Sequence, residues 1–302
     1  MELGFVGLGK MGMNMVERLR RDNHRIVAFD LEKPKLAEVG TFGAFGVATL
    51  SEMVAKLEPP RLIWVMLPAG EPTETTVLEL GSLLQADDTI VDGGNSNFKD
   101  DGRRAADLGT RGIHYLDVGT SGGVWGLKNG YCLMVGGEEQ IFRRYETIFA
   151  TLAPPNGYAR VGGNGAGHYA KMVHNGIEYA MMQAYAEGFE SLHESGYGFD
   201  LAAMARLWGQ GSVVRSWMLE LAEIVLARDP ELRRIRGFVA DSGEGRWAVI
   251  DAIERGIAAP ATALALFARF RSRAGQGVAS TFSEKLLAAL RDQFGGHGVM
   301  KE

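Results

Sequence analysis

The segment 171–179 carries groups that can exchange protons with a substrate. It places four polar side chains at positions i, i+3, i+4 and i+7: Lys171, His174, Asn175 and Glu178. In a helix this spacing puts all four on one face. The lysine is a potential base and the glutamic acid a potential acid. The pattern therefore indicates acid–base catalysis, with the histidine and the asparagine orienting the substrate.

A surface helix could also carry these four residues as a solvated stripe. The other residues of the segment are largely apolar, for example Tyr169, Met172 and Ile177, and Gly165 and Gly167 allow a second backbone to approach. A polar face on so apolar a helix favours the interpretation that it lines a cleft.

A second pattern near the N-terminus is typical of phosphate binding. Gly7, Gly9 and Gly12 form G-x-G-x-x-G between an apolar run at 3–6 and a helical pattern that begins near Met11. Such a turn lets a pyrophosphate approach the backbone at the start of a helix, where free N–H groups and the helix dipole attract an anion. A glycine-rich chain can also contain this spacing as a plain turn, but the strand and the helix around it favour dinucleotide binding. The predicted cofactor-binding residues are Gly7, Leu8, Gly9, Lys10, Met11 and Gly12 of this turn, together with Asp30 and Asn95 further along the chain.

Asp30, at the end of the second predicted strand, bears on which dinucleotide is bound. A carboxylate there accepts hydrogen bonds from the adenine-ribose hydroxyls and repels a 2′-phosphate. NAD is therefore predicted as the preferred cofactor. NADP remains possible because Lys33 and Lys35 soften the repulsion, and Asp30 could also be only a solvated acid at a strand end.

Two more glycine-rich stretches follow predicted strands, and each could also be a mere turn. Asn95 lies in D-G-G-N-S after the strand at 89–91, and Ser121, Gly122 and Gly123 follow the strand at 113–118. Ligands of parallel sheets bind at the carboxyl ends of the strands, so both stretches suit an anionic ligand.

The elements that position these residues fall into two groups. Strands at 3–6, 25–29, 62–67 and 89–91 alternate with helices at 11–21, 33–39, 51–56 and 73–84, and further strands are predicted at 113–118 and 131–135. This alternation predicts a Rossmann-type, doubly wound parallel α/β sheet. Beyond the G-G-N-G-A-G cluster at 162–167 only helices are predicted, at 168–193, 201–207, 216–227, 246–255, 261–271 and 281–292, followed by an irregular tail from 294. We therefore expect a dinucleotide-binding domain over 1–162 and an all-helical domain over 163–302.

Composition narrows the function classes. The 302 residues suffice for two domains, and the net charge of -5 argues against a nucleic-acid partner. The single cysteine, Cys132, excludes an intrachain disulfide and a cysteine-based zinc site, and no metal is expected. No apolar run reaches the roughly 18 residues of a membrane helix, and no signal-peptide pattern is present, so we expect a cytoplasmic protein without a membrane partner.

The motifs together resemble the β-hydroxyacid dehydrogenase superfamily. Its marks are VGLGKMGMNM at 6–15, DVGTSGGVWG at 117–126 and GNGAGHYAKMVHN at 163–175. A closer resemblance, to the 6-phosphogluconate dehydrogenases, rests on VDGGNSNFKD, KMVHNGIEY, GSVVRSW and RDQFGGH. The length resembles that of the short form of this family.

The resemblance implies a reaction: oxidative decarboxylation of 6-phosphogluconate to ribulose 5-phosphate and CO₂ with reduction of NAD(P), as in the pentose phosphate pathway. Lys171 would take the proton of the C3 hydroxyl, and Glu178 would protonate C1 after decarboxylation. The sugar-acid end of this small phosphorylated substrate would be held by Asn95, Ser121, Gly122, Gly123, His174 and Asn175.

The resemblance also implies a phosphate site made of Tyr179, Arg269, Arg291 and His297. In this family the last two come from a neighbouring subunit. The helical domain would then also serve dimerisation, in a homodimer or homotetramer whose C-terminal tail completes the neighbour's site. A frayed C-terminus with incidental charges is the competing interpretation.

One segment departs from the family pattern. Long members carry K-G-T-G-K-W, whereas this chain reads S-G-E-G-R-W, with Ser242 and Glu244 at the lysine and threonine positions. The alternative is therefore a dehydrogenase of 3-hydroxyisobutyrate or tartronate semialdehyde type, which acts on a non-phosphorylated 3-hydroxy acid. A dinucleotide-binding protein without chemistry is a third hypothesis, and Lys171 speaks against it.

Overall fold

A computed structural model describes residues 1–274, 280–296 and 298–301. The chain divides into two compact units, Met1–Met172 and Val173–Glu302. The predicted domain boundary at 162/163 lies at the end of the last strand, just before the helix Ala166–Glu194 begins. The change from one compact unit to the other comes within that helix.

The first unit is built on an eight-stranded sheet. Its strands are β1 (Glu2–Val6), β2 (Arg25–Phe29), β3 (Phe45–Val47), β4 (Leu62–Val65), β5 (Thr89–Asp92), β6 (His114–Ser121), β7 (Cys132–Gly136) and β8 (Tyr158–Gly162). Their spatial order is β3-β2-β1-β4-β5-β6-β7-β8, and every neighbouring pair is parallel except β6 and β7. The predicted Rossmann-type class is thus confirmed. Strand β7 runs antiparallel because only a short connection, without a crossover helix that spans the sheet, joins it to β6.

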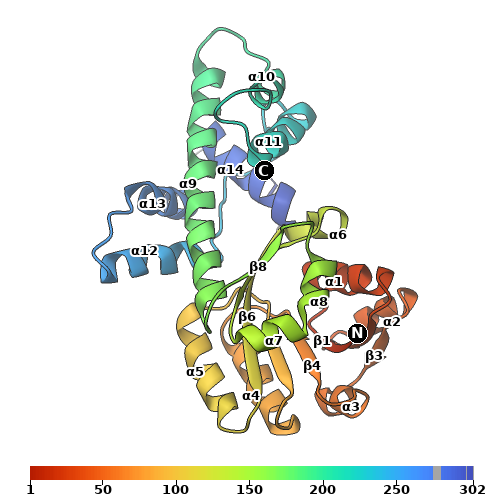
Figure 1. The fold of residues 1–302 in the computed structure, drawn as a ribbon. Coiled ribbons are helices and arrows are strands. Elements are labelled where there is room, and N and C mark those ends of the chain that lie inside the picture. Colours follow the sequence, from red (N-terminus) through yellow and green to blue (C-terminus); the bar gives the residue numbers. More distant parts are fainter. Residues whose placement is uncertain (275–279, 297, 302) are drawn as a thin grey trace. The chain divides into compact units, whose positions relative to one another are not determined.

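Helices cover both faces of this sheet (Figure 1). They are α1 (Lys10–Arg21), α2 (Lys33–Thr41), α3 (Leu50–Ala55), α4 (Glu71–Leu83), α5 (Phe98–Gly109), α6 (Gly126–Asn129), α7 (Glu139–Arg144) and α8 (Glu146–Leu152), with a 3-10 turn, η1 (Gly123–Trp125). Apolar side chains of α1, α7 and α8 form one core with one face, whereas those of α3, α4 and α5 form a second core on the other.

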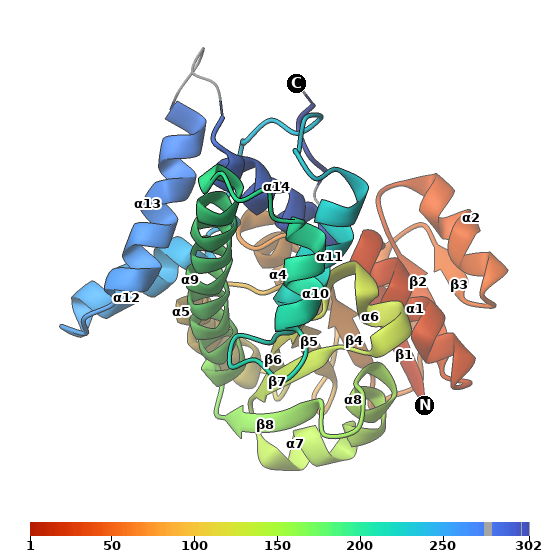
Figure 2. The ribbon, with the colours of Figure 1, turned by 90° about the horizontal axis from the view of Figure 1, so that it is seen from above.

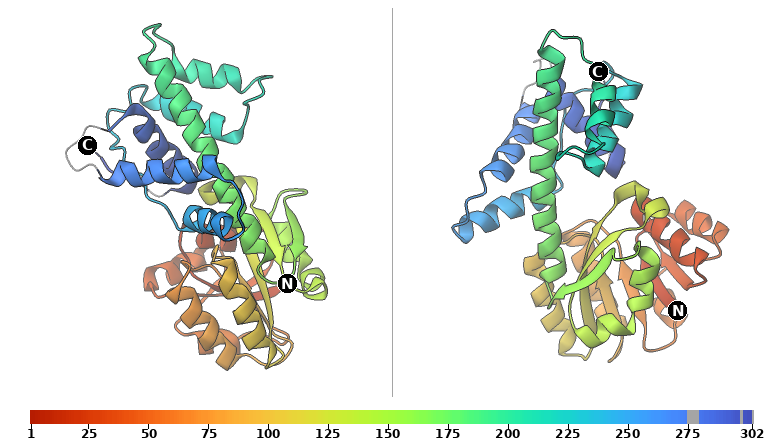
Figure 3. Two further views of the ribbon diagram at one scale, coloured as in Figure 1. Left: turned by 90° about the vertical axis from the view of Figure 1, so that its left-hand side faces the viewer. Right: turned by 45° about the horizontal axis from the view of Figure 1, so that its top comes forward.

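The second unit is helical, as predicted. The helices are α9 (Ala166–Glu194), which begins in the first unit, α10 (Leu201–Trp208), α11 (Trp217–Arg228), α12 (Glu244–Glu254), α13 (Pro260–Ala274) and α14 (Phe282–Gly295). Figure 2 and the right-hand view of Figure 3 show α12 and α13 on one side of α9, with α10 and α11 on the other. Among the described residues, no helix is long and apolar enough to cross a bilayer.

Some elements escaped the sequence-based prediction. Strand β3 has three residues, and β8 is largely exposed, so neither produces an apolar run. Helix α5 was missed because its sequence, FKDDGRRAADLG, is highly charged, and two of its charged residues, Asp101 and Arg104, point inward. The predicted irregular tail begins later than expected, because α14 extends to Gly295 before ending at a left-handed Gly296.

Candidate functional site

The three glycines of the N-terminal turn have different surroundings. Gly7 has φ +93°, and a Cβ there would collide with the Met66 carbonyl. A Cβ on Gly12 would collide with the Gly7 carbonyl, whereas Gly9 has nothing within 4 Å of an added Cβ. The first and third glycines therefore shape the turn and pack the helix on the strand. The second leaves open space, and this arrangement fits a bound pyrophosphate.

A cavity of about 570 Å³ opens beside this turn. It is lined by Leu8, Gly9, Lys10, Met13, Asn14, Lys35, Glu38 and Val124. Of the predicted cofactor residues, Leu8, Gly9 and Lys10 line it, while Met11 does not. Met13 and Asn14 also line the cavity but were not predicted from the sequence, although their spacing from Lys10 places them on the same face of α1.

Asp30 is held at the mouth of the turn by backbone groups. Its Oδ2 accepts a hydrogen bond of 2.6 Å from the Leu8 N–H, and its Oδ1 accepts one of 2.8 Å from the Glu32 N–H. The Lys35 Nζ lies 3.7 Å from Asp30 Oδ2 but 2.6 Å from Glu32 Oε1. The hydrogen bond to Glu32 is the main cause that raises the pKa of Lys35. The Lys35 ammonium group therefore pairs mainly with Glu32 and only weakly with Asp30.

Asn95 joins the ends of two strands. Its Nδ2 donates to the Thr120 carbonyl at 3.0 Å, and its Oδ1 accepts from the Thr120 N–H at 2.8 Å. This reciprocal pair ties the loop after β5 to the end of β6. The structure therefore brings Asn95 together with the segment Ser121–Gly123, as predicted from their positions at strand ends.

Lys171 lies against the same strand. An ideal Cβ on Gly119 would be 2.5 Å from the Lys171 Cβ and 2.6 Å from the Gly167 carbonyl oxygen. Helix α9 therefore rests directly on β6, and only a residue without a side chain fits beneath it. Residues 119 and 121 share one face of the strand, so Ser121 presents its side chain on the face that Lys171 covers. Lys171 is 5% exposed.

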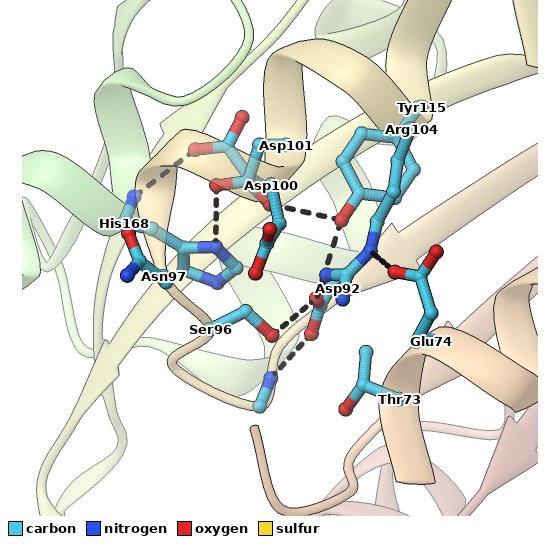
Figure 4. Close-up of polar contacts among 12 residues, drawn as sticks. Thr73, Glu74, Asp92, Ser96, Asn97, Asp100, Asp101, Arg104, Tyr115 and His168 are labelled. Carbon is cyan, nitrogen blue, oxygen red and sulfur yellow. Dashed lines mark hydrogen bonds and ion pairs between the residues drawn. The ribbon is translucent and has the colours of Figure 1, made fainter. Parts of the chain in front are cut away.

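A buried polar network, which the sequence did not predict, lies next to the start of α9 (Figure 4). The Asp92 carboxylate accepts hydrogen bonds from Ser96 Oγ at 2.7 Å and from Arg104 Nη1 at 3.1 Å. The Tyr115 hydroxyl donates to Asp101 Oδ1 at 2.9 Å, and His168 Nδ1 lies 2.8 Å from Asp101 Oδ2. All six side chains are buried.

The imidazole of His168 is charged in this setting. Burial alone would lower the pKa of His168, but the charge of Asp101 and the hydrogen bond to it prevail and raise the pKa to about 9. Burial raises the pKa of Asp101 to about 6 despite His168. At neutral pH the two therefore form a buried ion pair.

Asp92, Asp101 and His168 could in principle hold a metal ion, because one ligand atom of each lies within 4.8 Å of the others. The Arg104 guanidinium already donates a hydrogen bond to Asp92. The Asp101 carboxylate accepts a hydrogen bond from Tyr115 and pairs with His168. The carboxylates are thus compensated by cations of the chain itself, and the donor set does not fit an additional cation.

The other predicted polar residues of α9 lie in the second unit. Asn175 is buried, and its Oδ1 is 3.1 Å from His174 Nδ1. His174 Nδ1 is 3.9 Å from Glu178 Oε2. The seven residues from Lys171 to Glu178 correspond to two turns of helix, or about 10 Å along its axis.

Tyr179 and Arg269 form the centre of the predicted phosphate site. The Arg269 guanidinium carbon lies 3.3 Å from the centroid of the Tyr179 ring, and the arginine is 2% exposed. It donates a long hydrogen bond of 3.4 Å to the Ala240 carbonyl and one of 3.4 Å to the Met182 sulfur, and both acceptors are neutral. Among the described residues it has no carboxylate within ion-pair distance. Burial lowers the pKa of Arg269, and such a poorly compensated guanidinium is suited to an anion.

Arg291 is a second arginine of the predicted phosphate site. Burial lowers the pKa of Arg291, whereas electrostatic interactions with Tyr179, Glu244 and Glu178 act in the opposite direction. Arg291 therefore interacts with groups of its own chain, whereas the resemblance implied a role in the site of a neighbouring subunit. His297 lies outside the described residues, and the role of the tail between subunits stays a prediction.

The segment that departs from the family pattern also meets Tyr179. Helix α12 begins at Glu244, and a Cβ on Gly245 would collide with the Tyr179 ring. Glu244 is buried and accepts a hydrogen bond from the Ser242 hydroxyl. A buried carboxylate that interacts electrostatically with Tyr179 and Arg291 therefore lies at the position where long family members have a threonine.

The glycine turn, the acidic group beside it and the helical second unit define the class as a dinucleotide-binding Rossmann protein with a helical C-terminal part. The family model described as the NAD binding domain of 6-phosphogluconate dehydrogenase matches residues 2–163, and that of the 6-phosphogluconate dehydrogenase C-terminal domain matches residues 167–278. The chain belongs to the 6-phosphogluconate dehydrogenase family.

Relatives of the same length support the short form. The chain is 42% identical over 302 residues, and over the full length of both proteins, to Bacillus subtilis YqeC, whose name assigns it provisionally to 6-phosphogluconate dehydrogenase. It is 40% identical over 304 residues, covering all of this chain and 99% of the relative, to the NAD(+)-dependent, decarboxylating 6-phosphogluconate dehydrogenase of Haloferax volcanii. The predicted family and its short form are thus confirmed.

Solved structures confirm the fold alone. Plasmodium falciparum 6-phosphogluconate dehydrogenase has a TM-score of 0.82 at 24% identity, covering 96% of this chain and 70% of its own. Mycobacterium tuberculosis 3-hydroxyisobutyrate dehydrogenase has a TM-score of 0.76 at 21% identity, covering 94% of this chain and 97% of its own.

The position of Asp30 makes cofactor preference testable. We expect Asp30→Ala to lower kcat/KM for NAD about tenfold or more, because hydrogen bonds to a charged group are worth about 1.5–3 kcal/mol. The value for NADP should fall less or rise, so the ratio of the two is the measurement. Asp107→Ala, which removes the same charge from an exposed site on α5, is the control. An unchanged ratio would remove Asp30 from the ribose site.

The raised pKa of His168 predicts a pH-dependent stability. A group with a raised folded-state pKa stabilises fully below its unfolded pKa, about 6.5, and loses that contribution as pH rises through its folded pKa. The difference in Tm between the wild type and His168→Asn should therefore narrow as pH rises from about 6.5 to beyond about 9. A difference in Tm that is constant over this range would contradict a charged His168.

Proposed function

We propose that this protein oxidises and decarboxylates 6-phosphogluconate to ribulose 5-phosphate and CO₂, with NAD preferred over NADP. The observation that carries the proposal is the placement of Lys171, a buried amine on a helix that rests on β6 beside Ser121. Family membership supports the same conclusion. The Haloferax volcanii relative is named as NAD(+)-dependent, which supports the assignment of the cofactor.

Lys171 acts as the base. It accepts the proton of the substrate's C3 hydroxyl while the C3 hydride leaves. The nicotinamide of NAD(P)⁺ supplies the hydride acceptor when it is bound. The product is a β-keto acid, which loses CO₂ readily because the electrons of the C1–C2 bond flow toward the C3 carbonyl. Lys171, now protonated, stabilises the oxygen at C3, and positioned groups of this kind contribute about 10²–10⁴-fold each.

Glu178 completes the reaction as the acid. Loss of CO₂ leaves an enediol, and Glu178 protonates the carbon that was next to the lost carboxylate, which becomes C1 of ribulose 5-phosphate. The sugar-acid end is held by Asn95, Ser121, Gly122, Gly123, His174 and Asn175. This role agrees with the Asn95–Thr120 link and with the 3.1 Å contact between His174 and Asn175.

The phosphate is assigned to Tyr179, Arg269, Arg291 and His297. The buried, poorly compensated Arg269 supports this assignment most strongly. Glu244, which interacts electrostatically with Tyr179 and Arg291, favours one alternative, a 3-hydroxy acid without a phosphate, because a buried carboxylate opposes a phosphate dianion. The two candidate functions thus differ in what the arginines bind.

A homo-oligomer is part of the proposal. The second unit exposes large apolar side chains on three helices: Val173 and Ile177 of α9, Ile250 and Ile253 of α12, and Leu264 and Phe267 of α13. Large exposed apolar side chains that gather on a few helices are typical of a subunit interface. It supports a dimer or tetramer formed through the helical unit.

Replacement of the proposed base should separate chemistry from cofactor binding. We expect Lys171→Met to lower kcat by about 10²–10⁴-fold or more, because a methionine cannot accept the proton of the C3 hydroxyl. The Kd for NAD, measured by fluorescence quenching, should stay at the wild-type value. Lys128→Met, at an exposed position of α6, is the matched control. Turnover near the wild-type rate in Lys171→Met would exclude Lys171 as the base.

The charges around Tyr179 predict opposite effects on substrate affinity. We expect Arg291→Ala to raise KM for 6-phosphogluconate about tenfold or more, with little effect on KM for NAD. Glu244→Thr should lower KM for 6-phosphogluconate, because it removes a carboxylate from the anion site. Arg228→Ala on α11 controls for the loss of an arginine. Equal changes in both KM values would argue against a phosphate contact.

A further inference from the structure

The first turn of α9 is held by a side chain that is distant in sequence. Asp117, a fully buried residue of β6, accepts hydrogen bonds through Oδ1 from the Gly165 N–H at 2.7 Å and through Oδ2 from the His168 N–H at 3.0 Å. The first N–H groups of a helix lack partners within the helix, and the dipole there favours a negative charge. Asp117 therefore caps α9 from the sheet.

His168 fixes the same turn from another side. Its Nδ1 pairs with Asp101 of α5 at 2.8 Å, with both side chains fully buried. Asp101 in turn accepts a hydrogen bond from Tyr115 of β6 (Figure 4). The helix start is thus tied to β6 by its backbone and to α5 by a side chain.

The tie determines where Lys171 sits. Lys171 follows His168 by three residues, so the two lie on neighbouring positions of the helix surface. The backbones of α9 and the sheet touch at Gly167, where an ideal Cβ would be 2.5 Å from the Asp117 carbonyl oxygen. Because the backbones are in direct contact, α9 cannot slide along β6 without a collision as long as its first turn stays bound to Asp117 and Asp101. A displacement of about 1 Å at a reacting group can cost about 10²-fold in rate.

We infer that Asp117 and His168 are positioning residues, which together hold the first turn of α9 on β6 and thereby fix the amine of Lys171. Both side chains are buried within the first unit, so they act through the helix and not on the substrate. The inference about the helix stands on the contacts alone. Only its consequence for turnover rests on the proposed function.

The test compares two variants with a matched control. Asp117→Asn keeps the shape of the side chain but replaces one acceptor oxygen by an NH₂ group that faces an N–H. His168→Asn shortens the side chain and removes its charge. Asp88→Asn serves as the control. Asp88 is also fully buried, and its carboxylate also accepts hydrogen bonds from backbone N–H groups, those of Arg61 and Gln85. It precedes the first residue of β5, whereas Asp92, which belongs to the network beside α9, is the last residue of that strand.

Two readouts decide the outcome. Hydrogen exchange of the segment 163–172 should accelerate in Asp117→Asn and His168→Asn and stay at the wild-type rate in Asp88→Asn. With 6-phosphogluconate and NAD, at a temperature where all variants are folded, kcat should fall about 10- to 100-fold in the first two variants, with KM nearly unchanged. Asp88→Asn should lower Tm without such a loss of kcat.

The inference is overturned if exchange of the segment is unchanged in both variants. It is also overturned if kcat falls no more than in Asp88→Asn at an equal loss of Tm, since the role would then be stability alone. If one variant does not fold, the other carries the test. If the wild type does not turn over 6-phosphogluconate, the proposed function fails, while the exchange experiment still tests whether these residues hold α9.

Discussion

The direct contact between helix α9 and strand β6 is the constraint on which the site depends. Gly119 and Gly167 have no side chains, so the two backbones meet, and Lys171 lies against the strand that ends in Ser121. Asn95 ties the next strand end to the same place. The base and one part of the proposed substrate site are therefore held by regular secondary structure, which is how a reactive group keeps a fixed position.

Two kinds of buried charge occur in the chain. In the polar network of the first unit, Asp92 is paired with Arg104 and Asp101 with His168. In the second unit, Arg269 is buried on an aromatic ring and donates hydrogen bonds to neutral atoms. A compensated network stiffens the fold, whereas a guanidinium with spare donors can still bind an anion. The arrangement separates the groups that support the fold from the arginine that we propose as part of the phosphate site.

Much of the fold followed from the sequence, because alternation of apolar strands with helices is a local signal. The glycine turn and the polar face of α9 were predicted for the same reason. The supporting network was not. Asp117 caps a helix that begins 49 residues later, and α5 buries an acid and an arginine that a hydrophobic pattern assigns to the surface. The interaction of Arg291 with Tyr179 of its own chain likewise depends on how distant helices pack.

The central claim is that one reaction couples oxidation to the loss of CO₂. The most direct measurement supplies the purified protein with 6-phosphogluconate labelled with ¹³C at its carboxylate, together with NAD or NADP, and follows reduced cofactor and labelled CO₂ in the same sample. We expect reduced cofactor and labelled CO₂ to appear in equal amounts, and both to form faster with NAD than with NADP. Reduced cofactor without CO₂, or no reduction with this substrate while a non-phosphorylated 3-hydroxy acid is oxidised, would contradict it.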